Sequence, residues 1–214
     1  LNDLSQLLKA VIPIATGAGD LIMEYFQSGS LKVSKKSDDT PVTTADIAAH
    51  ELIVSALEQF TDWPILSEEG HIPDFNVRRQ WQRYWLIDPL DGTRGFVQGS
   101  DEFTVNIALI DQHRPILGVV YAPVFDELYY SCSGQPAYLR TAGADQVIST
   151  AETPFEALRF IVGKYHKIKR MQPVLDAIPG AQLLRMNSSL KFLQIACGKA
   201  DVYPRFGPIS EWDT

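Results

Sequence analysis

Apolar residues recur at helical spacing in the first part of the chain. Between Leu4 and Tyr25 they return every three or four positions, which predicts an amphipathic helix with a kink at Pro13. The stretch SKKSDDTPVTT that follows is polar and has no periodicity. A second helical pattern runs from Ala45 to Leu57, and Thr43 or Thr44 is the expected N-cap.

Short apolar runs in the middle of the chain predict strands. WPIL and YWLI each end abruptly in acidic residues and a glycine, as buried strands do where they deliver side chains to a loop. FTVNIALID and PILGVVYAP, joined by QHR, predict a hairpin, and ELYYSC with AYLR predicts another.

Beyond about residue 150 the pattern alternates between strands and helices. The order is LRFIVG, a helix over residues 167–178, QLLRM, a helix over residues 188–199 and DVYPRF, which predicts a sheet layered with helices. The composition changes near TAGADQVISTAETP. We therefore expect an N-terminal α+β subdomain over residues 1–150 and a C-terminal α/β subdomain over residues 151–214.

Composition and charge exclude several classes of partner. The chain has 214 residues and a formal net charge of -7, and no Lys/Arg block is longer than two residues. These features argue against nucleic acid or an anionic membrane surface as the main partner. Cys132 and Cys197 have no metal-ligand spacing and indicate reduced thiols, so we expect a cytoplasmic protein. The first residues lack a basic region and an apolar run long enough for a signal peptide or membrane span.

Acidic residues follow two of the predicted strands. Glu68 and Glu69 end one, and Asp88 and Asp91 end the other. If these strands are neighbours the carboxylates converge, and they cannot all stay ionised without a cation between them. Oxygen ligands with no His or Cys nearby favour Mg2+ over Zn2+.

The turn DPLDGT suits a metal and a phosphate together. Pro89 fixes its φ, Gly92 permits a conformation that a side chain would block, and Thr93 offers a hydroxyl at the expected start of a helix. The alternative, that the motif is only a turn, stays open for the motif alone, and the second acidic strand end counts against it. The D-x-x-D spacing favours attack by metal-bound water over a covalent route.

Several longer motifs carry a family resemblance. WLIDPLDGTRGF, with PVTTAD and LSEEG before it and EWDT after it, resembles the lithium-sensitive, Mg2+-dependent phosphatases of the inositol monophosphatase superfamily. The segments EFTVNIALID, PILGVVYAPV, SSLKF and YPRFGP are most like those of bacterial 3'(2'),5'-bisphosphate nucleotidases. The similarity runs from about residue 10 to the last residue.

The resemblance implies a fold, a reaction and a cofactor. The fold is a layered α/β/α/β/α sandwich of the inositol monophosphatase and fructose-1,6-bisphosphatase type, with an incomplete C-terminal part. The reaction is hydrolysis of the 3'-phosphate of adenosine 3',5'-bisphosphate, or of 3'-phosphoadenylyl sulfate, by water activated by two or three Mg2+ ions. The N-terminal subdomain would bind the metal and the C-terminal one would set specificity. The partner is a small nucleotide, and weak peripheral association with the inner membrane is compatible with the resemblance.

The resemblance also assigns roles, residue by residue. Asp46 and Thr93 would orient and deprotonate the nucleophile. The implied metal ligands are Glu68, Asp88, the carbonyl of Leu90, Asp91 and Asp213. The implied substrate-binding residues are Glu68, Leu90, Asp91, Gly92, Thr93, His166, Ser188, Lys191, Arg205 and Asp213.

Each assignment has a plainer alternative. An Asp in the first turn of a helix, such as Asp46, is favoured by the helix dipole by about 0.3–1 kcal/mol. Ser188 would serve as an N-cap, and His166, Lys191 and Arg205 as surface residues. Glu69 would be a solvated neighbour of Glu68. Lys36 would either screen the charge of the metal cluster or be an ordinary solvated lysine, and the two interpretations have equal weight. Trp81, Tyr84 and Trp85 are better explained by packing than by stacking on a base.

Departures from the family pattern concern substrate preference. Residues 163–166, Gly-Lys-Tyr-His, replace the usual Ser-Arg-Ser-His, Asn187 replaces a glycine, and Gly95 replaces an acidic residue. The family continues past WDT into a helix, so a chain that stopped at Thr214 would leave Asp213 without the element that orients it. Two other functions remain open, an inositol-phosphate or sugar-phosphate phosphatase and a non-catalytic nucleotide-binding protein.

Overall fold

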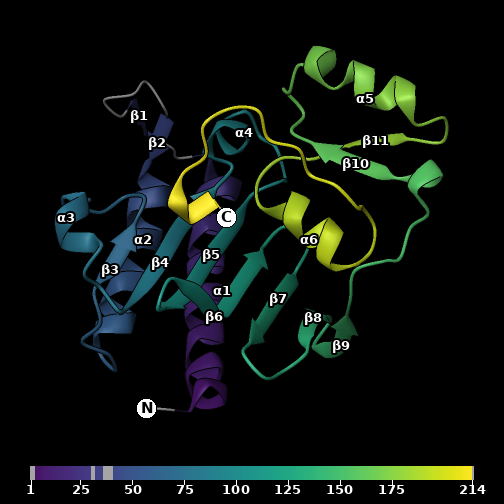
Figure 1. Cartoon of the computed structure of the whole chain (residues 1–214). Coiled ribbons are helices and arrows are strands. Elements are labelled where there is room, and N and C mark those ends of the chain that lie inside the picture. The colour runs from purple at the N-terminus through teal and green to yellow at the C-terminus, as the bar shows by residue number, and fades with distance from the viewer. Residues whose placement is uncertain (1–2, 30–31, 36–40, 214) are drawn as a thin grey trace.

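A seven-stranded mixed sheet forms the centre of the molecule (Figure 1). The computed structural model describes residues 3–29, 32–35 and 41–213. The first two strands of the sheet are parallel and all other neighbours are antiparallel. The order of the strands in the sheet is β3 (Ile65–Ser67), β4 (Arg83–Asp91), β5 (Thr104–Asp111), β6 (Arg114–Ala122), β7 (Glu127–Cys132), β8 (Ala137–Thr141) and β9 (Ala144–Ile148).

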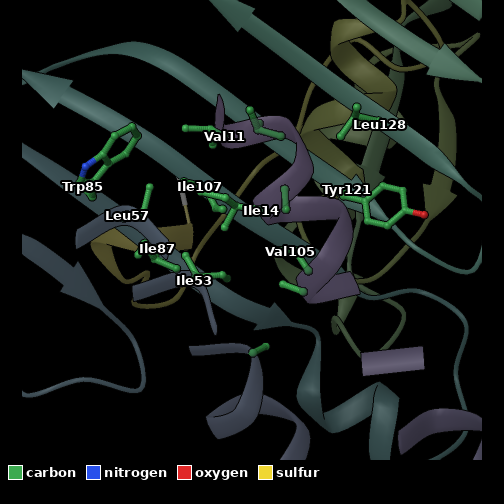
Figure 2. Close-up of a cluster of buried hydrophobic side chains, with 14 of the residues drawn as sticks. Val11, Ile14, Ile53, Leu57, Trp85, Ile87, Val105, Ile107, Tyr121 and Leu128 are labelled. Atoms are coloured by element: carbon green, nitrogen blue, oxygen red, sulfur yellow. The ribbon is translucent and has the colours of Figure 1, made fainter. Parts of the chain in front are cut away.

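Two helices cover one face of this sheet and bury the main core. They are α1 (Leu4–Ser28) and α2 (Thr44–Glu58), which match the two predicted helices, and Pro13 lies inside α1. Figure 2 shows Val11 and Ile53 of these helices among side chains of the sheet such as Trp85 and Ile107. All four of these side chains are at most 1% exposed, so the packing that the sequence predicts for Trp85 is confirmed.

Helix α1 is long and apolar enough to pass a test for a membrane span. It has 25 residues, and the mean hydropathy of its most apolar window is 1.2. The expectation that the first residues hold no such run was therefore wrong by length and composition. However, the apolar stripe Leu7, Val11, Ala18 and Ile22 is buried against the sheet, as in the core helix of a globular fold.

The other face of the sheet carries three further layers. Helix α6 (Leu190–Ala196) packs there through Leu190 and Leu193. Beyond it lies a second, parallel sheet of β10 (Arg159–Val162) and β11 (Gln182–Arg185), and α5 (Gln172–Ala177) covers that sheet (Figure 1). The order is therefore helix, sheet, helix, sheet, helix, which confirms the predicted layered α/β fold.

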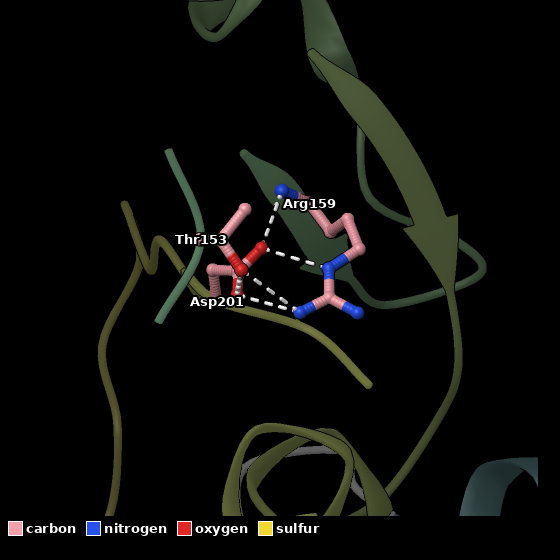
Figure 3. A network of polar contacts seen from close by, with 3 residues as sticks. All are labelled: Thr153, Arg159 and Asp201. Carbon is pink, nitrogen blue, oxygen red and sulfur yellow. Dashed lines mark hydrogen bonds and ion pairs between the residues drawn. The ribbon is translucent and has the colours of Figure 1, made fainter. Parts of the chain in front are cut away.

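The carboxylate of the half-buried Asp201 ties the second sheet to the segment that follows α6 (Figure 3). Asp201 accepts hydrogen bonds from the backbone N–H of Arg159 at 2.8 Å, from the Arg159 guanidinium and from the hydroxyl of Thr153 at 2.6 Å. These donors hold the pKa of Asp201 well below its usual range. The network fixes the start of β10 relative to the end of α6.

Several elements differ from the prediction in their length, in their type or in being present at all. The helix expected over residues 167–178 is the 3-10 turn η2 (Ile168–Arg170) followed by α5, because Pro173 can only occupy a first turn. The DVYPRF strand is reduced to one bridge between Val202 and Phe160, since Pro204 has no N–H to donate. Short polar strands went unpredicted, namely β1 (Val33–Lys35), β2 (Pro41–Thr43) and β9, as did the 3-10 turn η1 (Phe155–Ala157).

Candidate active site

The two acidic strand ends lie side by side. β3 and β4 are parallel neighbours in register, and the N–H of Glu68 donates to the Ile87 carbonyl at 3.1 Å. The condition under which the sequence predicts that the carboxylates converge is therefore met. Because parallel strands end at the same edge of a sheet, Glu68 and Asp88 emerge at one place.

Three carboxylates form a compact cluster at this edge. One oxygen each of Asp88, Asp91 and Asp213 lies within 4.8 Å of the others. Asp88 is 1% exposed, and its Oδ2 has no hydrogen-bond partner among the described residues. An unpartnered buried oxygen within a set of oxygen donors fits a hard divalent cation such as Mg2+, and these three residues would hold it.

The acidic groups act strongly on one another. Burial raises the pKa of Asp88 well above its ordinary value, and the charges of Asp91, Glu68, Asp213 and Asp46 raise it further. Burial also raises the pKa of Asp91 to about 6, although the nearby charge of Lys191 opposes this. Glu68 is not part of the compact cluster, but its charge reaches both of these groups. The cluster is therefore short of positive charge.

Asp46 and Thr93 form a hydrogen-bonded pair next to the cluster. Asp46 lies in the first turn of α2, where it makes a capping box with Thr43, one of the two expected N-caps. The hydroxyl of Thr93 lies 2.9 Å from Oδ1 of Asp46 and 3.0 Å from the Leu90 carbonyl. Burial raises the pKa of Asp46, against the hydrogen bonds from Thr43 and Thr93. Asp46 thus has both the capping role and the contact with Thr93.

Gly92 allows the chain to turn from β4 into α4 (Thr93–Val97). Its φ is 102°, and a Cβ at this position would lie 2.8 Å from the Glu102 carbonyl oxygen. Both facts exclude a side chain here, as predicted from the motif. The turn therefore brings the backbone of Glu102 directly against the metal-site loop.

Contacts that precede Asp213 in the chain hold it in place. Asp213 lies in the 3-10 turn η3 (Glu211–Asp213), and Trp212 packs on the cluster that contains Leu66 and Leu86. Arg78, at the end of α3 (Phe75–Arg78), donates to both carboxylate oxygens of Glu211 at 2.7 Å. These contacts place the carboxylate of Asp213 beside Asp88.

A continuous groove leads away from the carboxylates. A cavity of about 160 Å³ is lined by Asp91, Asp213 and Ser189, and a second of about 310 Å³ by Arg94, His166 and Asn187. Both are also lined by Ser188, Lys191, Tyr203 and Arg205. The predicted substrate residues Ser188, Lys191, Arg205 and His166 thus share one groove with the carboxylates of Asp91 and Asp213.

The turn before α6 links the groove to the metal site. The N–H of Ser189 donates to Oδ2 of Asp91, and Nζ of Lys191 donates to the Ser188 carbonyl. Lys191 is 8% exposed and lies 5.2 Å from the Tyr203 ring centroid. Burial lowers the pKa of Lys191, while the charge of Asp91 raises it. The alternative of Lys191 as an ordinary surface lysine is therefore wrong. Ser189 is the N-cap of α6 and makes no side-chain cap hydrogen bond, whereas Oγ of Ser188 accepts from the N–H of Leu190 at 3.3 Å, so the capping alternative for Ser188 remains open.

The loop of residues 163–166, which departs from the family pattern, is held by contacts with three other segments of the chain. Nη1 of Arg185 lies 3.1–3.3 Å from the carbonyls of Gly163, Lys164 and His166. Nζ of Lys164 lies 2.9 Å from Glu102, and the Tyr165 hydroxyl donates to Gln98 at 2.6 Å. The ring of His166 stacks on Phe206, and its Nε2 is buried without a partner among the described residues.

Sequence reasoning missed several groove residues. Arg94 directly follows the DGT motif and lines the larger cavity, and Tyr203 precedes the PRF segment. Glu102 accepts from the N–H of Asn187 at 2.9 Å and pairs with Lys164, so it joins the groove to the loop. Lys36 lies outside the described residues.

Comparison with known protein sequences identifies the family of the chain. Residues 3–214 match the inositol monophosphatase family. The chain is 43% identical over 210 residues to the 3'(2'),5'-bisphosphate nucleotidases CysQ of Salmonella typhimurium and Escherichia coli, covering 97% of this chain and 84% of theirs.

Comparison with solved structures identifies the same family. The structure of CysQ from Bacteroides thetaiotaomicron, a bacterial member of that family, superposes with a TM-score of 0.83 at 34% identity over 99% of this chain and 83% of its own. The Thermotoga maritima IMPase superposes with a TM-score of 0.78 at 26% identity, covering 92% of this chain and 75% of its own. This chain belongs to the inositol monophosphatase family.

Proposed function

We propose that this chain is a Mg2+-dependent phosphatase that removes the 3'-phosphate of adenosine 3',5'-bisphosphate. It would yield AMP and phosphate, and 3'-phosphoadenylyl sulfate would react in the same way. The observation that carries the proposal is the groove in which Lys191 and Arg205 line both the acidic cavity and the wider cationic one. Such a groove suits a substrate with one phosphate at the carboxylates and a second farther along. Relatives named as bisphosphate nucleotidases support this substrate.

The carboxylate cluster at the acidic cavity and the residues next to it would act on the reacting phosphate. Asp88, Asp91 and Asp213, with Glu68 and the Leu90 carbonyl, would hold two or three Mg2+ ions, which supply charge neutralisation and activate water. Thr93 would take a proton from the attacking water and pass its own to Oδ1 of Asp46, 2.9 Å away. The burial that raises the pKa of Asp46 makes this carboxylate a stronger base than an exposed one.

The residues of the groove would bind the rest of the nucleotide. The ammonium of Lys191 and the guanidinium of Arg205 would bind the 5'-phosphate together with Ser188, and His166 would contact the base. Residues 1–150 would thus act as the metal-binding subdomain and residues 151–214 as the specificity subdomain. A cytoplasmic location, with weak association with the inner membrane allowed, belongs to the same proposal.

A direct comparison of substrates tests this function. Phosphate release would be measured from adenosine 3',5'-bisphosphate and from inositol 1-phosphate, with Mg2+ and with or without Li+. We expect faster turnover of the nucleotide and inhibition by Li+. Faster turnover of the inositol ester would instead identify an inositol-phosphate phosphatase, and nucleotide binding without hydrolysis would identify a non-catalytic binding protein.

A further inference from the structure

Asp91 lies where the pairing between β4 and β5 is interrupted. Asp88 pairs with Asn106 and Asp91 with Thr104, and the register of the two strands shifts between these pairs. Such an irregularity disrupts the β ladder locally, so backbone pairing fixes Asp91 less firmly than the residues before it. Asp91 belongs to the compact carboxylate cluster, and its orientation therefore depends on further contacts.

Ser189 supplies one of these contacts from the turn before α6. Its N–H donates to Oδ2 of Asp91. The turn is strained, because Ser188 has a φ of 56°, in the left-handed region that residues other than glycine rarely adopt. Such a conformation persists where the surrounding structure enforces it. The contacts that hold this turn therefore also determine where the N–H of Ser189 points.

Two side chains of β5 hold Ser189 through its hydroxyl. Oγ of Ser189 lies 2.8 Å from Oγ1 of Thr104 and donates to Oδ1 of Asn106 at 2.9 Å. Since Ser189 has a single hydroxyl proton and gives it to Asn106, Thr104 is the donor in the other hydrogen bond. Thr104 is fully buried and Ser189 is 8% exposed. The three side chains therefore form a directed chain of hydrogen bonds, largely shielded from water, between β5 and the turn that contacts Asp91.

We infer that Thr104, Ser189 and Asn106 are positioning residues for Asp91. By fixing the turn before α6, they hold the carboxylate of Asp91 in the orientation in which it binds Mg2+. The inference rests on the proposed function, because it takes Asp91 to be a metal ligand. The same turn leads into Lys191, so the network also fixes this lysine relative to the carboxylates.

Metal affinity in variants of Thr104 tests the network. Because Thr104 is fully buried, a substitution there acts on a bound ion only through neighbouring residues. Kd for Mg2+ would be measured by calorimetry on the nucleotide-free protein. Thr104→Val keeps the shape and removes the donor, so Kd should rise about tenfold, as for other residues that orient metal ligands. Thr104→Ser keeps the hydroxyl and should bind Mg2+ like the parent. Asn106→Ala, at a half-buried position, should also raise Kd and provides the test if Thr104→Val fails to fold.

A matched control separates positioning from general stability. The hydroxyl of Thr61, which follows α2, also has two partners, the Leu57 carbonyl at 3.2 Å and Nε1 of Trp85 at 2.9 Å. Thr61→Val should lower Tm much as Thr104→Val does and leave Kd for Mg2+ unchanged. A parent-like Kd in Thr104→Val and Asn106→Ala, with only Tm lowered, would overturn the inference. If the parent binds Mg2+ but does not hydrolyse adenosine 3',5'-bisphosphate, the proposed function fails, and the comparison of Kd values still decides on the network.

Discussion

The hydroxyl of Thr93 bridges Oδ1 of Asp46 and the carbonyl of Leu90, at 2.9 and 3.0 Å. Asp46 belongs to the first turn of α2 and Thr93 begins α4, so the bridge joins two elements that are 47 positions apart. One hydroxyl proton faces two acceptors, and burial has raised the pKa of Asp46. The pair therefore forms a short path for a proton beside the carboxylate cluster.

Replacing Thr93 by Val should separate binding from chemistry. The substitution keeps the shape and removes the hydroxyl, so kcat for 3'-phosphate release should fall about 10²–10⁴-fold with little change in KM. Asp46→Asn should have a similar effect on kcat. Thr141→Val, on an exposed position of β8, is the matched control and should retain full activity. A parent-like kcat in Thr93→Val would contradict the proton path.

The pKa of Asp91 predicts a pH-dependent effect of Mg2+ on stability. Because burial raises this pKa from 3.8 to about 6, the folded protein binds more protons than the unfolded chain between these values. The stability of the metal-free protein should therefore fall as pH rises from about 4 to 6. Mg2+ replaces the lost protons, so it should raise Tm clearly at pH 7.5 and hardly at pH 5. Scanning calorimetry with EDTA or Mg2+ measures both effects.

The variant Asp91→Asn provides the control for this pH dependence. Without the charge of Asp91, the metal-free protein should be more stable than the parent at pH 7.5, and its Tm should respond less to Mg2+. An unchanged response to Mg2+ would exclude Asp91 as a ligand.

The acidic cluster was largely predictable because two of its three members lie at the end of one strand. Asp88 and Asp91 end β4, and the parallel pairing of β3 with β4 needed only the apolar runs that precede the acidic residues. The support of Asp213 was not predictable, since Trp212 docks on residues more than a hundred positions earlier in the chain. The role of Glu102 was hidden for the same reason, because its partners lie 62 and 85 positions later, at Lys164 and Asn187.

Strand β9 and the pair β1 and β2 were not predictable for a different reason. Four of the five residues of β9 are exposed, so the strand carries no alternation of apolar and polar residues. Pairing with β8 holds it in the sheet. Backbone hydrogen bonding to an existing edge does not need an apolar pattern, and a search for such patterns passes over it.

Glu102 should control substrate affinity more than catalysis. One of its carboxylate oxygens accepts from the N–H of Asn187 and the other pairs with Lys164. Glu102→Gln would weaken both contacts and loosen the loop over the groove, so KM for the nucleotide should rise about fivefold at a nearly constant kcat. A double-mutant cycle with Lys164→Met should show coupling. Additive effects on KM would mean that the two side chains act independently.

Anchoring of the η3 turn should determine metal affinity. Trp212→Ala removes the packing against Leu66 and Leu86, so Asp213 would no longer be held against Asp88. The Mg2+ concentration for half-maximal activity should rise about tenfold, as for other residues that orient metal ligands. Glu211→Gln weakens the contact with Arg78 but keeps the packing of Trp212, so it should have a smaller effect. An unchanged Mg2+ requirement in Trp212→Ala would show that the packing of Trp212 does not control metal affinity.

Asp201 should stabilise the fold without acting in the reaction. Its side chain is 8% exposed and accepts hydrogen bonds from Thr153 and Arg159 (Figure 3). Asp201→Asn should therefore lower the free energy of unfolding, measured by urea titration, by about 1–3 kcal/mol. Asp145→Asn, in the exposed pair with Arg140, should cost less than about 1 kcal/mol. Because the pKa of Asp201 is depressed, its contribution is present above the ordinary carboxyl pKa and is lost as pH falls through the folded-state value. The gap between parent and Asp201→Asn should therefore narrow in acid, and a gap that widened instead would mean that the carboxylate is not the stabilising form.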